Sequence, residues 1–212
     1  MIANIGQFFI LALGIIFAEN ILFSRGFGSD VVLRTAVNPK EFLKFGTIIT
    51  IVTVLASIIG WAVESVADLL NYDLNSGYTF SRAVLYITGL TIIYLAANGA
   101  IKKWNKPLYE KLSLTLPIAV FNTATLGAPV MMTRINDTIM AQATDNGFLI
   151  AIFTGLFISI GFLFAVVLMS EGIQQIEAMD IPDAFKGIPA KLVYTGLLAM
   201  AFSAFSGRVA SI

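Results

Sequence analysis

Six apolar stretches of this 212-residue chain are long enough to cross a lipid bilayer as helices. A spanning helix needs about 20 mostly apolar residues. The six stretches cover residues 5–23, 42–63, 83–101, 112–132, 147–169 and 191–205. Hydrophobic residues make up 58% of the chain and charged residues 12%, against about 45–50% and about 25% in an average soluble domain. The sequence therefore predicts a single-domain, all-α, multi-pass membrane protein over residues 1–212, in contact with the lipid bilayer.

Two residue types on which much protein chemistry depends are missing from the chain. There is no cysteine and no histidine, which excludes thiol nucleophiles, thiolate-bound iron–sulfur clusters, Ser–His triads and the usual zinc and haem ligands. The 13 basic and 13 acidic residues give a net charge of zero, so the chain lacks the basic surface that nucleic acid requires. We expect no catalytic residues, no metal site and no nucleic-acid partner.

Basic residues are distributed unequally between the two sides of the predicted membrane segments. Ten lie in the connections after the first, third and fifth stretches or at the start of the stretch that follows: Arg25, Arg34, Lys40, Lys44, Lys102, Lys103, Lys106, Lys111, Lys186 and Lys191. Three lie on the other side: Arg82, Arg134 and Arg208. Because cytoplasmic connections are enriched in lysine and arginine, both termini are predicted to lie outside the cytoplasm. No charged region precedes the first stretch, so we expect it to belong to the fold and not to a signal peptide.

The two halves of the chain share landmarks in the same order. Asn20 corresponds to Asn122, residues 53–60 to residues 154–161, and residues 88–90 to residues 195–197. The halves, about residues 1–105 and 106–212, then contain three spans each. Three is an odd number, so the second half must run inverted relative to the first. Inverted repeats place functional sites near the bilayer midplane, at broken helices in corresponding positions.

The first and fourth stretches contain residues that interrupt helices. Gly26 and Gly28 follow the polar end of the first stretch, and Pro117, Gly127 and Pro129 lie within the fourth. A proline removes a backbone donor and its ring clashes with the preceding turn. Such a break at membrane depth requires protein or water to satisfy the freed backbone groups. The sequence therefore predicts broken half-helices in the first and fourth spans.

Polar residues beside these interruptions are candidates for an ion site near the midplane. They are Glu19, Asn20, Asn122, Thr123 and Thr125. An ionised acid such as Glu19 costs about 3 kcal/mol in the hydrocarbon region, so it either serves as a cation or proton site or pairs with Arg25. Asparagine and threonine oxygens suit hard cations, but the same groups also form hydrogen bonds between helices. The sequence leaves both interpretations open.

Four short motifs, in order along the chain, resemble those of one membrane protein family. Glu19, Asn20, Ser24 and Gly28 follow the pattern E-N-x-x-x-S-x-x-x-G-x-C, and residues 116–127 are similar to L-P-x-x-x-x-N-C-A-x-L-G. Residues 180–187 follow D-[VI]-P-x-x-F-[KR]-G, and residues 205–207 match the family's ending. Over essentially its whole length the chain resembles the A subunit of the Rnf complex and its counterpart, the E subunit of the sodium-translocating NADH:quinone reductase (Nqr).

The resemblance implies six spans in two inverted halves, an inversely oriented paralogue as partner, and one [2Fe-2S] cluster held by cysteines of both subunits. In this chain the family's cysteines fall on Asp30 and Thr123, and thiolates are the normal ligands of such clusters. We therefore expect no cofactor.

The resulting hypothesis is a non-catalytic, cysteine-less membrane subunit of an Rnf/Nqr-type ion-translocating electron-transport complex in the bacterial inner membrane. The alternatives are a small cation or solute transporter with a midplane site between the repeats, and a purely structural partner subunit.

Overall fold

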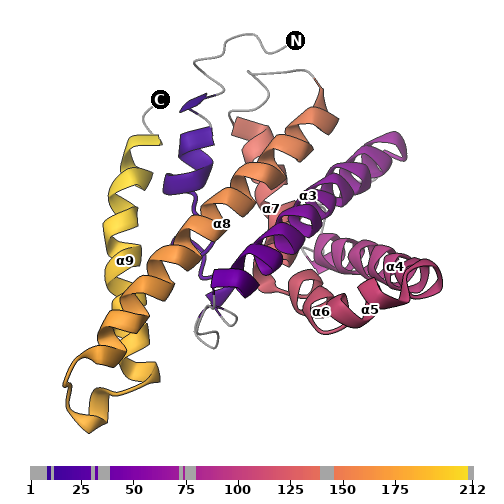
Figure 1. The fold of residues 1–212 in the computed structure, drawn as a ribbon. Helices are drawn as coiled ribbons and strands as arrows, with labels where there is room; N and C mark the ends of the chain where they lie inside the picture. Colours follow the sequence, from indigo (N-terminus) through magenta and orange to yellow (C-terminus); the bar gives the residue numbers. More distant parts are fainter. Residues whose placement is uncertain are drawn as a thin grey trace.

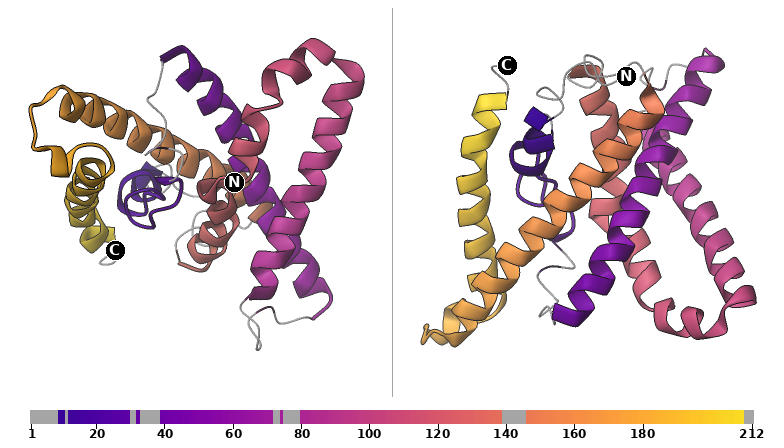
Figure 2. Two further views of the ribbon diagram at one scale, coloured as in Figure 1. Left: turned by 90° about the horizontal axis from the view of Figure 1, so that it is seen from below. Right: turned by 45° about the horizontal axis from the view of Figure 1, so that its top comes forward.

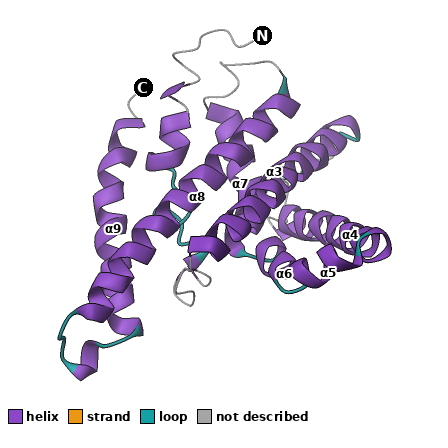
Figure 3. Cartoon of the chain, viewed as in Figure 1, coloured by secondary structure: helices purple, strands orange, loops and turns teal. Residues whose placement is uncertain are grey.

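The computed structural model describes residues 9–10, 12–29, 32, 39–71, 74, 80–138 and 146–209. Every regular element within these ranges is helical, and no strand occurs there (Figure 3). The elements are the π-helix η1 (Gly14–Ala18), α3 (Pro39–Leu69), α4 (Phe80–Trp104), α5 (Lys106–Leu112), α6 (Thr115–Val120), α7 (Thr123–Thr138), α8 (Gly147–Ala178), the 3-10 helix η3 (Asp183–Phe185) and α9 (Ile188–Val209) (Figure 1).

Five segments in the described part of the chain are long and apolar enough to cross a membrane. They are Phe45–Leu69, Phe80–Trp104, Thr115–Thr133, Gly147–Ala178 and Ile188–Phe205. These segments overlap the second to sixth predicted stretches, which confirms the prediction of an all-α membrane protein. The first predicted stretch, residues 5–23, begins outside the described residues, so the count of six spans stays a prediction.

The helices α3 and α8 cross near the centre of the molecule and make its most extensive contacts (Figure 2). Gly155 of α8 makes this close crossing possible, because a Cβ atom there would lie 2.7 Å from the Cα of Val54 in α3. Four small polar side chains are buried along these two helices: Thr53, Ser57, Thr154 and Ser159. Small residues let helix backbones approach closely, which is how helices commonly pack in lipid.

The helices α4 and α9 lie on opposite flanks of this centre (Figure 1). Only Tyr86 and Leu90 of α4 are buried, and among the described side chains of α9 only Phe202 is. Their outward faces are apolar, and Ile92 and Met200 are among the exposed residues. Contiguous exposed apolar surface of this kind is expected where a helix meets lipid or another chain.

The start of α3 and two connections that contain basic residues lie at the same end of the molecule. α3 begins at this end, α4 is joined to α5 there, and α8 is joined there to α9 through η3 (Figure 2, right). The bend between α4 and α5 is capped by Asn105, whose Oδ1 accepts a hydrogen bond from the Leu108 amide at 3.1 Å. Such a cap satisfies one of the free amides at a helix start. The predicted orientation requires these connections to share one side of the membrane.

Candidate functional site

The first helix break lies directly after η1. The Glu19 amide donates to the Gly14 carbonyl oxygen at 2.9 Å, which closes a wide π turn, and the helix ends before Asn20. The chain then turns through Gly26 and Gly28, whose φ angles are 72° and 84°. These angles lie in the left-handed region that glycine adopts without steric cost. Both predicted break residues of the first span therefore shape the turn that follows the break.

Asn20 is the centre of the first break, and 0% of its surface is exposed. Its Nδ2 donates to the carbonyl oxygens of Ile16 and of Gly161 in α8, both at 2.9 Å. Its Oδ1 accepts from the amides of Leu22 and Phe23 at 3.1 and 3.2 Å. The two donor hydrogens and two acceptor positions of the side-chain amide are all used. Asn20 therefore satisfies the broken backbone and attaches it to α8.

The second break separates α6 from α7 at Phe121 and Asn122. Asn122 is buried, and its Oδ1 accepts from the Ala124 amide at 2.8 Å. The Thr125 hydroxyl donates across the break to the Ala119 carbonyl oxygen at 2.7 Å. The Nδ2 of Asn122 has no hydrogen-bond partner among the described residues. Each break is thus organised by a buried asparagine that caps the amide two residues ahead, but the second asparagine keeps an unused donor.

The two breaks contact each other beside α8. The Gly28 amide donates to the Thr123 Oγ1 at 2.7 Å. Gly28 also lies against the ring of Phe162 in α8, and Gly127 of α7 lies against the ring of Phe27. A Cβ atom on either glycine would overlap the facing ring. Small residues at these two positions therefore let the broken segments approach each other.

The prolines of the fourth span do not lie at its break. Pro117 is the third residue of α6, where its missing amide has no acceptor within the helix. Pro129 and Gly127 lie inside α7. The Pro129 ring packs against Gly60 of α3, at which a Cβ atom would lie 2.9 Å from the Pro129 Cβ. The helix therefore breaks at Phe121–Asn122. This break comes before Gly127 and Pro129, which were predicted to interrupt the helix.

Glu19 forms an ion pair with Arg25 across the first break. The Arg25 Nη2 lies 2.9 Å from the Glu19 Oε2, and both side chains are partly exposed. The pair compensates the charge of the acid within the chain itself. Of the two interpretations open from the sequence, this contact favours the ion pair over an unpaired cation or proton site.

The remaining predicted ion ligands are engaged in hydrogen bonds. Oδ1 of Asn20 and of Asn122 and the Oγ1 of Thr123 accept from backbone amides, and the Thr125 hydroxyl donates to a carbonyl oxygen. The unused group of Asn122 is a donor, which a cation does not bind. No group of three or more acidic residues in the described ranges is placed to hold a metal ion. These contacts favour hydrogen bonding between segments over cation binding; Asp30 lies outside the described residues.

One polar cluster was not predicted from the sequence. Glu64 of α3 accepts a hydrogen bond from the Tyr86 Oη at 2.6 Å and another from the Arg82 Nη2 at 3.0 Å. Tyr86 is 1% exposed, so this cluster attaches the otherwise exposed α4 to α3. The sequence does contain a signal for it: Arg82 and Tyr86 are four residues apart and share one helix face, near the end of the preceding span that contains Glu64.

Comparison with known proteins shows which family this chain is similar to. Residues 8–209 match the family described as "Rnf-Nqr subunit, membrane protein". The chain is 29% identical over 203 residues to the A subunit of the ion-translocating oxidoreductase complex of Erwinia tasmaniensis, covering 96% of this chain and 98% of the relative. It is 28% identical over 193 residues to the A subunit of the Na(+)-translocating ferredoxin:NAD(+) oxidoreductase complex of Acetobacterium woodii, covering 91% and 93%. These full-length matches agree with the four sequence motifs, and the chain belongs to the Rnf-Nqr family of membrane subunits.

Proposed function

We propose that this chain is a membrane subunit of an ion-translocating electron-transport complex. The observation that carries the proposal is the match to the A subunit of such a complex, which extends over 96% of this chain and 98% of the relative from Erwinia tasmaniensis. A match of this extent includes both broken segments. We assign the chain no catalytic residue, because the Asn20 side chain and the Thr125 hydroxyl at the breaks hold the backbone.

We further infer two inverted repeats and an inversely oriented paralogue as partner. Asn20 and Asn122 support the repeat, since each lies at a break and caps the amide two residues ahead. The central crossing of α3 and α8, with α4 and α9 on opposite flanks, is the arrangement that an inverted duplication produces (Figure 1). Ser24, Phe121 and Thr123 are exposed beside the breaks, so a partner has polar and aromatic groups to contact there.

The donor atoms of this chain do not fit the [2Fe-2S] cluster that the family resemblance implies. Thiolates normally hold such clusters, and the sequence has no cysteine. At the position of one family cysteine, the Thr123 Oγ1 instead accepts a hydrogen bond from the Gly28 amide at 2.7 Å. We propose that in this chain hydrogen bonding, and not cluster ligation, joins the two breaks.

The alternative function is a small cation or solute transporter with a midplane site. A cation site needs oxygen atoms that are free to replace the hydration shell of the ion. Glu19 is paired with Arg25, and both electron-pair positions of the Asn20 Oδ1 accept from amides. The contacts therefore favour a role within a complex over independent transport.

We place the complex in the bacterial inner membrane with both termini outside the cytoplasm. The support is the position of the connections that carry Lys102, Lys103, Lys106, Lys111, Lys186 and Lys191, which lie at one end of the molecule (Figure 2). Cytoplasmic connections are enriched in lysine and arginine.

Purification from native membranes tests the proposed function. With an affinity tag added at the chromosomal locus and a mild detergent, we expect the chain to elute in a complex much larger than a 212-residue chain. The complex is expected to contain further subunits of different sequence, detected by mass spectrometry, and bound redox cofactors, detected by visible absorption. A tagged component of another multi-subunit complex from the same membrane is the control. Elution of this chain alone, while the control complex stays intact, would show that the proposed function is wrong.

A further inference from the structure

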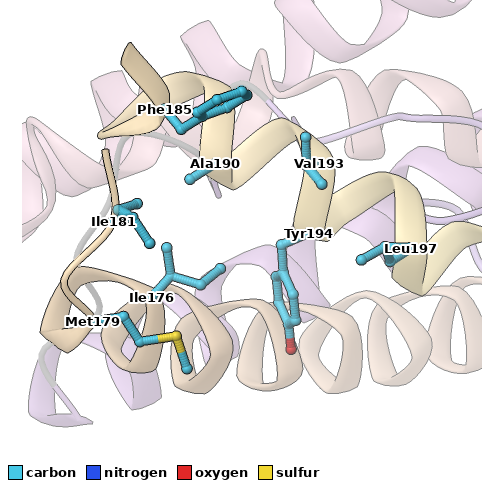
Figure 4. Close-up of a pocket in the computed structure, with 8 residues that line it drawn as sticks. All are labelled: Ile176, Met179, Ile181, Phe185, Ala190, Val193, Tyr194 and Leu197. Carbon is cyan, nitrogen blue, oxygen red and sulfur yellow. The ribbon is translucent and has the colours of Figure 1, made fainter. Parts of the chain in front are cut away.

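An apolar groove lies between the end of α8 and the start of α9 (Figure 4). Its volume is about 380 Å³. Its lining includes Ile176 from α8, Met179, Ile181 and Phe185 from the connection, and Val193 and Leu197 from α9. Met179, Phe185, Val193 and Leu197 are each more than half exposed. Ala190 and the ring of Tyr194 complete the lining, and the Tyr194 hydroxyl is bonded to the Leu168 carbonyl oxygen. The groove is therefore open and presents an apolar surface to an incoming group.

Residues of the motif at 180–187 form part of this groove. The motif lies away from the helix breaks, so the groove gives it a structural role. Pro182 precedes η3, and Phe185 ends it within the groove lining. Gly187 has a φ of 80°, so it allows the sharp turn into α9 without strain. Tyr194 packs directly on Gly172 of α8, and its hydroxyl donates to the Leu168 carbonyl oxygen at 3.3 Å. The far wall of the groove is fixed by this contact.

The charges around the groove are predominantly acidic. Lys186 of the connection is in an ion pair with Asp183 at 2.6 Å, and Lys191 of α9 is in one with Glu177 at 2.9 Å. Asp180 lies between two lining residues, is exposed, and has no ion-pair partner among the described residues. The rim of charged residues beside the groove therefore has no unpaired lysine for a phosphate group, and it presents the unpaired carboxylate of Asp180.

We propose that this groove binds a segment of a partner polypeptide whose apolar side chains are flanked by lysine or arginine. An apolar groove accepts the anchor residues of an amphipathic helix, and acidic rim groups are complementary to basic flanks. Anionic lipid headgroups of the cytoplasmic leaflet are negatively charged and attract basic segments. The same headgroups are repelled by an acidic rim, which argues against a lipid as the occupant. The surface is separate from the helix breaks, because Gly161, which Asn20 contacts, and Ile176 are separated by about 22 Å along α8 at 1.5 Å per residue.

Site-specific photo-cross-linking in the complex from native membranes tests the proposal. The photoreactive amino acid p-benzoylphenylalanine is introduced at Val193, and the matched control is Leu192, which is adjacent, similarly exposed and not part of the lining. We expect a polypeptide adduct at Val193 that is several-fold more abundant than the adduct at Leu192. Mass spectrometry of the Val193 adduct is expected to identify a partner peptide that is apolar with basic flanks. Asp180→Lys is expected to reduce this adduct several-fold, whereas Asp180→Glu preserves it.

Each other outcome contradicts the proposal. Adducts with lipid alone, equal adducts at both positions, a partner segment with acidic flanks, or an Asp180→Lys yield equal to that of Asp180→Glu would overturn it. The proposal rests on the proposed function for the presence of other subunits. If those subunits co-purify and Val193 still forms no polypeptide adduct, only the groove proposal fails. Elution profiles of the variant complexes show whether each variant folds and assembles.

Discussion

Replacing Asn20 by alanine is expected to cause a large loss of stability in the purified protein. The substitution removes four hydrogen bonds from a fully buried position and leaves the Leu22 and Phe23 amides and the Gly161 carbonyl oxygen without their side-chain partner. A buried polar group without a partner costs about 1–3 kcal/mol, so the combined loss is about 4 kcal/mol or more. For a chain of this size that corresponds to a decrease of about 10 °C in the apparent melting temperature, measured in detergent by size-exclusion chromatography after heating.

Asn122→Ala is the matched control for this prediction. Asn122 occupies the corresponding position in the second break and is also buried, but within the described part of the chain its side chain makes one hydrogen bond, which it accepts from the Ala124 amide. The expected loss is about 1–2 kcal/mol, since one buried donor loses its partner. Equal decreases in melting temperature for the two variants would show that the contacts of Asn20 with α8 do not hold the first break.

Gly155→Ala is expected to separate the two central helices. The added Cβ would lie 2.7 Å from the Val54 Cα and 3.2 Å from the Thr53 carbonyl oxygen, both of which belong to the backbone of α3. Backbone atoms cannot rotate away, so α3 and α8 must move apart along the most extensive interface of the described chain. Overpacking of this kind costs about 1–3 kcal/mol, which predicts a decrease of about 5 °C in the apparent melting temperature.

Gly196→Ala separates this effect from the general effect of alanine in a helix. Gly196 lies within α9, and no atom lies within 4 Å of the position that its Cβ would occupy. Alanine is the better helix former by about 1 kcal/mol, so the variant is expected to be as stable as the unsubstituted protein or slightly more stable. A lower melting temperature for Gly196→Ala than for Gly155→Ala would contradict the packing at the crossing.

The long apolar helices could be predicted from the sequence because an apolar run of about 20 residues identifies a membrane-spanning helix. The end of α8 shows the limit of that signal: the predicted stretch ends at residue 169, whereas the helix extends to Ala178. Hydropathy identifies the part that crosses the bilayer, but glutamate and glutamine beyond it are good helix formers. The break in the fourth span was expected, but its place was not, because Pro129 is accommodated inside α7 against Gly60.

The candidate site could be predicted as a set of residues but not as a set of contacts. The sequence identified Asn20 and Thr123 from their place in apolar stretches. It could not indicate that Asn20 reaches Gly161 or that Thr123 accepts from Gly28, because these partners are 141 and 95 residues away along the chain. The cluster of Glu64, Arg82 and Tyr86 was missed for a different reason: its members are close in the sequence, but the contact depends on the rotation of α4 against α3.

Iron analysis with electron paramagnetic resonance tests most directly whether this chain has the family fold without the family's cluster. The purified chain is incubated with iron and sulfide under reducing, anaerobic conditions and desalted, and iron and acid-labile sulfide are then measured together with the spectrum of the reduced sample. We expect neither bound sulfide nor a [2Fe-2S] signal, because the chain has no cysteine and Thr123 is hydrogen-bonded to Gly28. A stoichiometric [2Fe-2S] signal that Thr123→Val abolishes would contradict this interpretation.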